Sequence, residues 1–147
     1  MNASAKPRFA VMGAGSVGCF FGGMLARAGF PVTLIGRQSH VDAVNKDGLW
    51  LDAKAFSEHI PMQASTDASG VAGAKVILFC VKSADSAEAA RQMAPYLEKD
   101  AVIVCLQNGA ENPEIVRSVL PHRVIPAVVY VATEMAGPGH LKHHGRG

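Results

Sequence analysis

Short apolar runs alternate along the chain with stretches whose apolar residues recur at helical spacing. The first run covers residues 9–12 and ends at a glycine, and residues 17–25 then place apolar side chains three or four positions apart. Gly29 stands where a helix C-cap belongs, and residues 32–35 form a second, β-branched run. The pattern predicts a strand, a helix and a parallel strand within about 30 residues, joined by a right-handed crossover.

Two later apolar runs, residues 76–81 and residues 101–106, show no alternation with polar residues. Such runs are typical of parallel strands that are covered on both faces. Between them, residues 86–97 are rich in alanine and predict a helix that Pro95 ends early. We expect both runs to be central strands of one sheet.

The remaining segments predict shorter elements. Residues 39–46 suit a short helix closed by the turn Asp47-Gly48, and the apolar side chains of residues 49–62 indicate short strands or a hairpin. The last third predicts a helix over residues 111–120, a strand over residues 124–132, a turn over residues 137–139 and a short strand near Leu141.

Alternating strands and helices are typical of an α/β fold with a doubly wound, mostly parallel sheet, where ligands bind beyond the carboxyl ends of the strands. The chain has 147 residues, of which 49% are hydrophobic and 18% are charged, as in an ordinary globular protein. At this length we expect residues 1–147 to form a single domain.

Charge and cysteine usage exclude several classes of protein. The net charge is only +2 and the basic residues are scattered, so no nucleic-acid partner is expected. Every apolar run is shorter than the roughly 18 residues of a membrane span.

Residues 6–26 resemble a secretory signal in having basic residues before an apolar stretch, but the glycines in this stretch would make a poor helix. Cys19, Cys80 and Cys105 stand in apolar runs and indicate buried free thiols, so we expect a cytoplasmic protein.

A glycine-rich loop connects the first predicted strand to the first predicted helix. Gly13 permits a tight turn, Gly15 lets the backbone approach a pyrophosphate, and Gly18 allows the helix to pack on the strand. The amides at the helix N-terminus then face the phosphates. A purely structural turn is the alternative, but the strand before the loop and the helix after it favour a dinucleotide site. Its candidate cofactor-binding residues are Gly13, Ala14, Gly15, Ser16, Val17 and Gly18.

The residues after the second predicted strand, Gly36-Arg37, bear on the choice of cofactor. NAD-specific folds usually place a carboxylate there to hold the ribose 2′-hydroxyl. Arg37 can instead form charge-assisted bonds to a 2′-phosphate, so we predict NADP(H), with a solvated arginine as the alternative. A methyltransferase-like domain that uses S-adenosylmethionine is disfavoured, since it too would be expected to carry an acidic residue at this place.

Four features occur in the order found in one known family. They are the glycine loop with Arg37 downstream, Val81-Lys82 after a central strand, Leu106-Gln107-Asn108-Gly109, and the run from Pro138-Gly139-His140 to Gly147. Together they resemble the ketopantoate reductase (2-dehydropantoate 2-reductase) family of pantothenate biosynthesis. The resemblance implies a Rossmann-type N-terminal domain that holds NADPH, and a helical C-terminal domain that closes over the cleft to reduce ketopantoate to pantoate.

The resemblance also implies roles for two residues. It places Lys82 beside the cofactor, and Asn108 against both cofactor and substrate. Both follow strand carboxyl ends, where an ammonium group meets an anionic ligand and an amide orients a carbonyl. Without the resemblance they would be interpreted as a solvated lysine and an Asn-Gly turn.

The helical domain of the family is absent from residues 1–147, and it carries the general-acid lysine and an acidic substrate-binding residue. We therefore assign no catalytic residue in this chain, and expect it to bind cofactor but to catalyse poorly or not at all alone. A non-catalytic NADP-binding module or subunit, and a reductase of a different carbonyl substrate, stay open as alternatives.

Two further expectations concern partners. The face that a helical domain would cover favours self-association into a homo-oligomer. No metal site is expected, because His140, His143 and His144 fall on a short strand whose side chains point to opposite faces.

Overall fold

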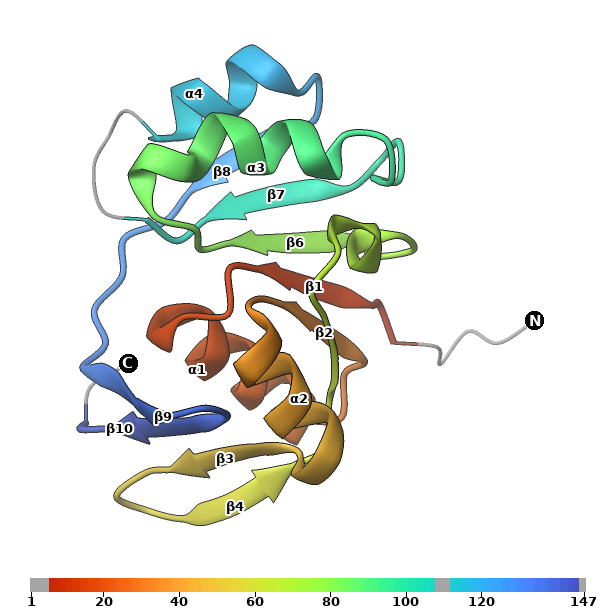
Figure 1. The fold of residues 1–147 in the computed structure, drawn as a ribbon. Coiled ribbons are helices and arrows are strands. Elements are labelled where there is room, and N and C mark those ends of the chain that lie inside the picture. The colour runs from red at the N-terminus through yellow and green to blue at the C-terminus, as the bar shows by residue number, and fades with distance from the viewer. Residues whose placement is uncertain (1–5, 108–111, 146–147) are drawn as a thin grey trace.

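The protein is described here by a computed structural model that covers residues 6–107 and 112–145 (Figure 1). The main sheet has the strand order β5 (Gln63–Ser65), β2 (Val32–Ile35), β1 (Phe9–Met12), β6 (Val76–Phe79), β7 (Val102–Cys105) and β8 (Arg123–Pro126). A smaller sheet has the order β4 (Ser57–Ile60), β3 (Leu49–Asp52), β10 (His140–His143) and β9 (Thr133–Gly137). The helices are α1 (Ser16–Arg27), α2 (Gln38–Asp47), α3 (Ser86–Met93) and α4 (Asn112–Val119), with short 3-10 turns η1 (Ala68–Val71) and η2 (Ser83–Asp85).

Every strand pair in the main sheet is parallel. The chain leaves β1 toward β2 on one side and later returns to β6 on the other side of β1, so the strand order reverses at β1. This reversal is the switch point of a doubly wound sheet, at whose carboxyl edge ligands bind. The prediction of an α/β fold with a doubly wound parallel sheet is therefore confirmed.

The two faces of the main sheet belong to separate hydrophobic cores. One core joins the sheet to α3 and α4 and contains the fully buried Ile77, Phe79 and Met93. The other joins the sheet to α1 and contains Val11 and Leu34. Strands with apolar side chains on both faces fit this sandwich, which is why their runs lack alternation.

Helix α1 lies between the main sheet and the small sheet. A Cβ atom on Gly22 would come within 2.8 Å of Val11 Cγ2 in the main sheet, and one on Gly23 within 2.8 Å of Leu49 Cδ2 in the small sheet. Leu141 of β10 is fully buried in the same core. The glycines of α1 thus let both sheets approach the helix closely.

The turn predictions agree with the backbone. Gly29, just beyond the C-terminus of α1, has a φ of +99°, and Gly48 at the end of α2 has a φ of +83°. Residues 49–62 contain the hairpin of β3 and β4, paired antiparallel from Leu49 with Ile60 to Asp52 with Ser57. Helix α3 ends at Met93, two residues before Pro95, as expected.

The strand predicted over residues 124–132 is wrong in extent. β8 ends at Pro126, and a separate strand, β9, begins at Thr133. Val128 and Tyr130 between them are each 76% exposed. An apolar run predicts burial, but in this segment the run has no strand partner among the described residues, so its side chains stay open.

Strand β5 was not predicted, because Gln63-Ala64-Ser65 has neither an apolar run nor alternation. The side chain of Asn45 in α2 holds Ala64 at both backbone groups: Nδ2 donates to the Ala64 carbonyl at 3.0 Å, and the Ala64 amide donates to Oδ1 at 2.9 Å. A tertiary contact therefore fixes this edge strand.

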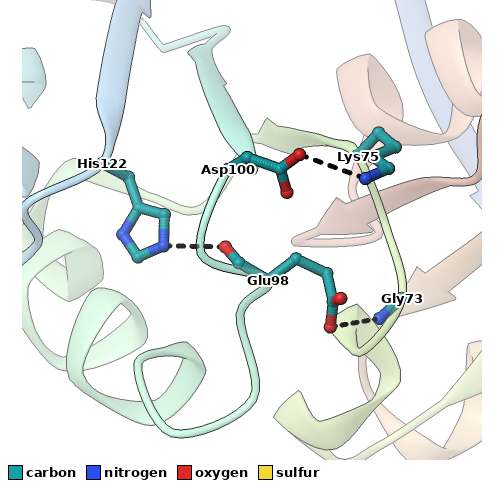
Figure 2. A network of polar contacts seen from close by, with 5 residues as sticks. All are labelled: Gly73, Lys75, Glu98, Asp100 and His122. Atoms are coloured by element: carbon teal, nitrogen blue, oxygen red, sulfur yellow. Dashed lines mark hydrogen bonds and ion pairs between the residues drawn. The ribbon is translucent and has the colours of Figure 1, made fainter.

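Polar cross-links join the loops at the amino ends of β6, β7 and β8 (Figure 2). Lys75 Nζ lies 3.1 Å from Asp100 Oδ2, and this contact lowers the pKa of the Asp100 carboxyl. The Gly73 amide donates to Glu98 Oε2 at 3.3 Å, and His122 Nε2 lies 3.0 Å from the Glu98 carbonyl oxygen. These contacts occupy the opposite end of the strands from the carboxyl edge.

Candidate functional site

The glycine loop begins directly at the carboxyl end of β1. Gly13 has a φ of +105°, and a Cβ atom there would lie 2.8 Å from the carbonyl carbon of Cys80. The Gly13 amide donates to the Ile35 carbonyl at 3.0 Å, and the Cys80 amide donates to the Met12 carbonyl at 2.8 Å. The loop is therefore seated between the ends of β2 and β6, where only glycine fits.

Gly15 and Gly18 differ in how much space surrounds them. A Cβ on Gly18 would lie 2.4 Å from the Gly13 carbonyl oxygen and 2.7 Å from Val11 Cγ1, so this glycine sets the contact between α1 and β1. At Gly15 no atom beyond the neighbouring residues of the loop lies within 4 Å of the Cβ position. The tight packing at Gly18 is present as the sequence predicts, and the open space at Gly15 is where the predicted pyrophosphate would lie.

Helix α1 starts without a side-chain cap. Gly15 is its N-cap, and the first turn contains no acidic residue. The backbone amides of a first turn lack intrahelical acceptors, and the helix dipole adds positive potential there. Of the other predicted loop residues, Ala14 is buried while Ser16 and Val17 are half-buried. The arrangement suits an anionic group, and contact of these residues with a cofactor stays a prediction.

Arg37 is the N-cap residue of α2 and is exposed. A Cβ atom on the preceding Gly36 would come within 2.6 Å of Ala14 Cβ, so Arg37 follows directly on the contact between β2 and the glycine loop. No ion pair joins Arg37 to an acidic side chain within residues 6–107 and 112–145. Its guanidinium is thus available to an anion at this edge.

Lys82 follows the end of β6 and is exposed. Its carbonyl accepts a hydrogen bond of 2.9 Å from the Asp85 amide, which closes the turn that leads into α3. The structure thus brings the glycine loop, Arg37 and Lys82 to the same edge of the sheet, at the ends of β1, β2 and β6. The predicted Asn108 lies outside the described residues.

From the sequence, Gln107 is assigned no role beyond its place in the motif Leu106-Gln107-Asn108-Gly109. In the structure its side chain makes two hydrogen bonds. Its side-chain Nε2 donates to the Val81 carbonyl at 2.6 Å and to Ser86 Oγ at 2.9 Å. A glutamine directly after a buried strand, at the carboxyl edge, is the signal that could have marked it.

The described part of the C-terminal motif includes strand β10 of the small sheet and the turn before it, whereas residues 146–147 lie outside the described residues. Gly139 has a φ of +67°, its amide donates to His40 Nδ1 at 3.0 Å, and its carbonyl accepts from the Trp50 amide at 2.8 Å. The motif therefore ties β10 to α2 and β3. Within the described part of the chain, no group of three His, Cys, Asp or Glu side chains could hold a metal ion.

The three cysteines are free thiols. Burial raises the pKa of Cys19 and of Cys80 to about 12, and that of Cys105 to about 11. They remain protonated near neutral pH and lack the depressed pKa of a nucleophilic cysteine. Among residues 6–107 and 112–145, no helix has the length and apolar character of a membrane span.

Comparison with known proteins identifies a family that matches nearly the whole chain, and another dehydrogenase that matches part of it. The model of the family described as ketopantoate reductase PanE/ApbA matches residues 9–147. The 2-dehydropantoate 2-reductase of Halobacterium salinarum is 37% identical over 147 residues, which cover 95% of this chain and 47% of that protein. A glycerol-3-phosphate dehydrogenase (NAD(P)+) of Rhizobium etli is 39% identical over 108 residues, covering 71% of this chain and 33% of that protein.

Solved structures agree with this result. A PanE/ApbA family ketopantoate reductase from Ralstonia eutropha has a TM-score of 0.94 and 56% identity to this chain, covering 95% of it and 47% of the other. The chain therefore spans about half the length of the reductases it matches. Since the family model covers nearly the whole sequence and the fold agrees with a solved member, the protein belongs to the ketopantoate reductase family.

Proposed function

We propose that this chain is the NADPH-binding part of an oxidoreductase that reduces a 2-oxo acid, ketopantoate, to pantoate by hydride transfer. The observation that carries the proposal is the convergence of the glycine loop, Arg37 and Lys82 on the carboxyl edge of the main sheet in a member of this family. Bound NADPH would supply the hydride.

The chain's own residues would bind and orient the cofactor. The uncapped amides of α1 offer hydrogen-bond donors to the pyrophosphate, and the open space at Gly15 leaves no side chain in the way. Lys82 would bring a positive charge from the end of β6. The residues predicted for this role remain Gly13 to Gly18, Arg37, Lys82 and Asn108, with Asn108 also touching the substrate.

The preference for NADP(H) over NAD rests on the end of β2. Residues 36–40 contain no carboxylate, and Arg37 forms no ion pair within the described residues. A charge-assisted bond to a 2′-phosphate is worth about 1.5–3 kcal/mol, which corresponds to roughly tenfold to hundredfold in affinity.

Titration of the purified chain with NADPH and with NADH, by calorimetry or fluorescence, tests this assignment. Arg37→Ala is expected to weaken NADPH binding by about tenfold to hundredfold and to leave NADH binding unchanged. Arg91→Ala, on the exposed surface of α3, is the matched control. Equal losses for the two nucleotides would show that Arg37 does not recognise the 2′-phosphate.

We further propose that the chain forms one domain, binds cofactor and turns over substrate poorly or not at all alone, because it spans about half of its relatives and contains no residue assigned as a general acid. The assay is oxidation of NADPH in the presence of ketopantoate, repeated with other 2-oxo acids. Measurable turnover of ketopantoate would contradict a non-catalytic module, whereas turnover of only another carbonyl compound would change the assigned substrate. The three free thiols, of which Cys19 and Cys105 are buried, support a cytoplasmic location.

Self-association is part of the proposal as well. A hollow of about 310 Å³ lined by apolar side chains of α1, β6 and Leu106 opens on the α1 face of the sheet. Tyr130 is 76% exposed in the segment between β8 and β9. Sedimentation velocity over a range of concentrations tests this, and a monomer at all concentrations would contradict it.

A further inference from the structure

The segment that carries Lys82 is a short connection between a strand and a helix. It runs from Val81, past the turn η2, to Ser86, the first residue of α3. The Asp85 amide closes this turn on the Lys82 carbonyl at 2.9 Å. The Lys82 side chain is exposed and has no ion-pair partner within the described residues, so its position depends on how the two ends of the segment are held.

One side chain holds both ends. Gln107 Nε2 donates to the Val81 carbonyl at 2.6 Å and to Ser86 Oγ at 2.9 Å. The Val81 carbonyl belongs to the peptide bond that leads directly into Lys82. Ser86 is fully buried, so the second contact is made at a fixed point of the protein.

The chemistry of the partners requires this orientation of the amide. A carbonyl oxygen only accepts hydrogen bonds, so the group of Gln107 that faces Val81 must be the NH₂. Both of its protons are then used, one at each end of the Lys82 segment. A carboxylate or an apolar side chain at position 107 cannot make this pair of bonds.

We propose that Gln107 is a positioning residue for the cofactor site, which acts by clasping Val81 to Ser86 and thereby fixes Lys82 relative to the carboxyl edge. The inference rests on the proposed function, because it takes Lys82 to lie beside the bound nucleotide. In this role a residue that follows β7 would act on a site formed by the ends of β1, β2 and β6.

The test is a double-mutant cycle on NADPH affinity in the full chain. Gln107→Leu removes both hydrogen bonds with little change in side-chain volume, and Lys82→Ala removes the group that is positioned. Gln107→Leu is expected to weaken NADPH binding about tenfold in the wild-type background and to have no effect in the Lys82→Ala background. Gln92→Leu, at an exposed glutamine of α3, is the control and is expected to leave affinity unchanged.

Amide hydrogen exchange without nucleotide is the second measurement. Gln107→Leu and Ser86→Ala are both expected to accelerate exchange of the Asp85 amide, while amides of the β1 strand keep their protection. General loss of protection in both variants would overturn the positioning role, because the two hydrogen bonds would then stabilise the whole fold rather than the Lys82 segment.

The outcomes separate this role from the proposed function. Unchanged NADPH affinity in Gln107→Leu, an equal loss in both backgrounds, or unchanged exchange at Asp85 each overturns the positioning role. If the wild-type chain binds no NADPH but the exchange at Asp85 responds, the clasp is structural only, and the failure lies with the proposed function and with the role built on it.

Discussion

Alanine at Gly15 and alanine at Gly18 should have opposite consequences, although the two residues are three positions apart in one loop. At Gly15 a Cβ atom would meet no atom within 4 Å beyond the neighbouring residues of the loop. The φ of −88° is accessible to any residue. At Gly18 the Cβ would lie 2.4 Å from a backbone carbonyl oxygen of Gly13. The first change should affect the ligand, and the second should affect the fold.

The magnitudes follow from these contacts. Alanine is a poorer N-cap residue than glycine, which costs Gly15→Ala about 0.5 kcal/mol of unfolding free energy. At Gly18 alanine gains up to about 1 kcal/mol of helix propensity but overpacks a rigid backbone contact, which costs about 1–3 kcal/mol. Since the carbonyl cannot rotate away, we place Gly18→Ala at the upper end, with a net loss of about 2 kcal/mol and a fall in Tm of roughly 4–8 °C.

Two assays on the same samples separate the effects. Thermal unfolding followed by circular dichroism gives Tm, and a fluorescence titration below Tm gives the Kd for NADPH. Gly15→Ala is expected to keep its Tm within about 2 °C and to lose at least about tenfold in affinity, because the new methyl group occupies the space assigned to the pyrophosphate. A stable Gly18→Ala, or undiminished NADPH binding by Gly15→Ala, would refute the reasoning.

The other predictions concern the cores, the thiols and pH. Leu141→Ala removes a fully buried side chain between the small sheet and α1 and should lower the free energy of unfolding by about 2–5 kcal/mol in urea titrations. The buried thiols of Cys19 and Cys105 should react with a disulfide reagent at neutral pH only as fast as the protein opens, so urea should accelerate their labelling; rapid labelling of these two thiols in the native chain would contradict their burial and raised pKa values. Asp100 has a lowered pKa in the folded state, so its contact with Lys75 stabilises above the unfolded carboxyl pKa and is lost as pH falls through the folded value. Asp100→Asn should be the less stable chain at pH 7 and equal to wild type in strong acid.

The central strands of the main sheet could be predicted because each one is a contiguous run of apolar residues. Uninterrupted apolar runs such as residues 76–81 correspond to strands with a core on each face, and Gly48 marks the end of α2 with its positive φ. Local sequence could not supply β5, since this polar segment is a strand only through its pairing with β2 and the contacts of its Ala64 backbone with the Asn45 side chain. It also misjudged the extent of β8, because hydrophobicity alone does not say whether a partner strand is present.

Some residues of the candidate site could be predicted from local sequence, and others could not. The glycine loop and Arg37 follow from spacing, because a strand, a turn and a helix are contiguous in sequence. Gln107 needed the fold, since its two partners lie 26 and 21 residues earlier and come near it only when β6 and β7 pair. Hydrogen bonds between distant loops have no periodic signature in a single sequence.

The parallel pairing of β10 with β3 has a consequence for the order in which the protein folds. The hairpin of β3 and β4 uses neighbouring residues and can form as soon as it is made, whereas His140 reaches Trp50 only after some ninety residues have been added. Until then one edge of β3 is unpaired, and the hydrophobic core between α1 and the small sheet lacks Leu141. A nascent chain therefore exposes a strand edge open to intermolecular pairing, and closing this long loop should be a slow step of folding.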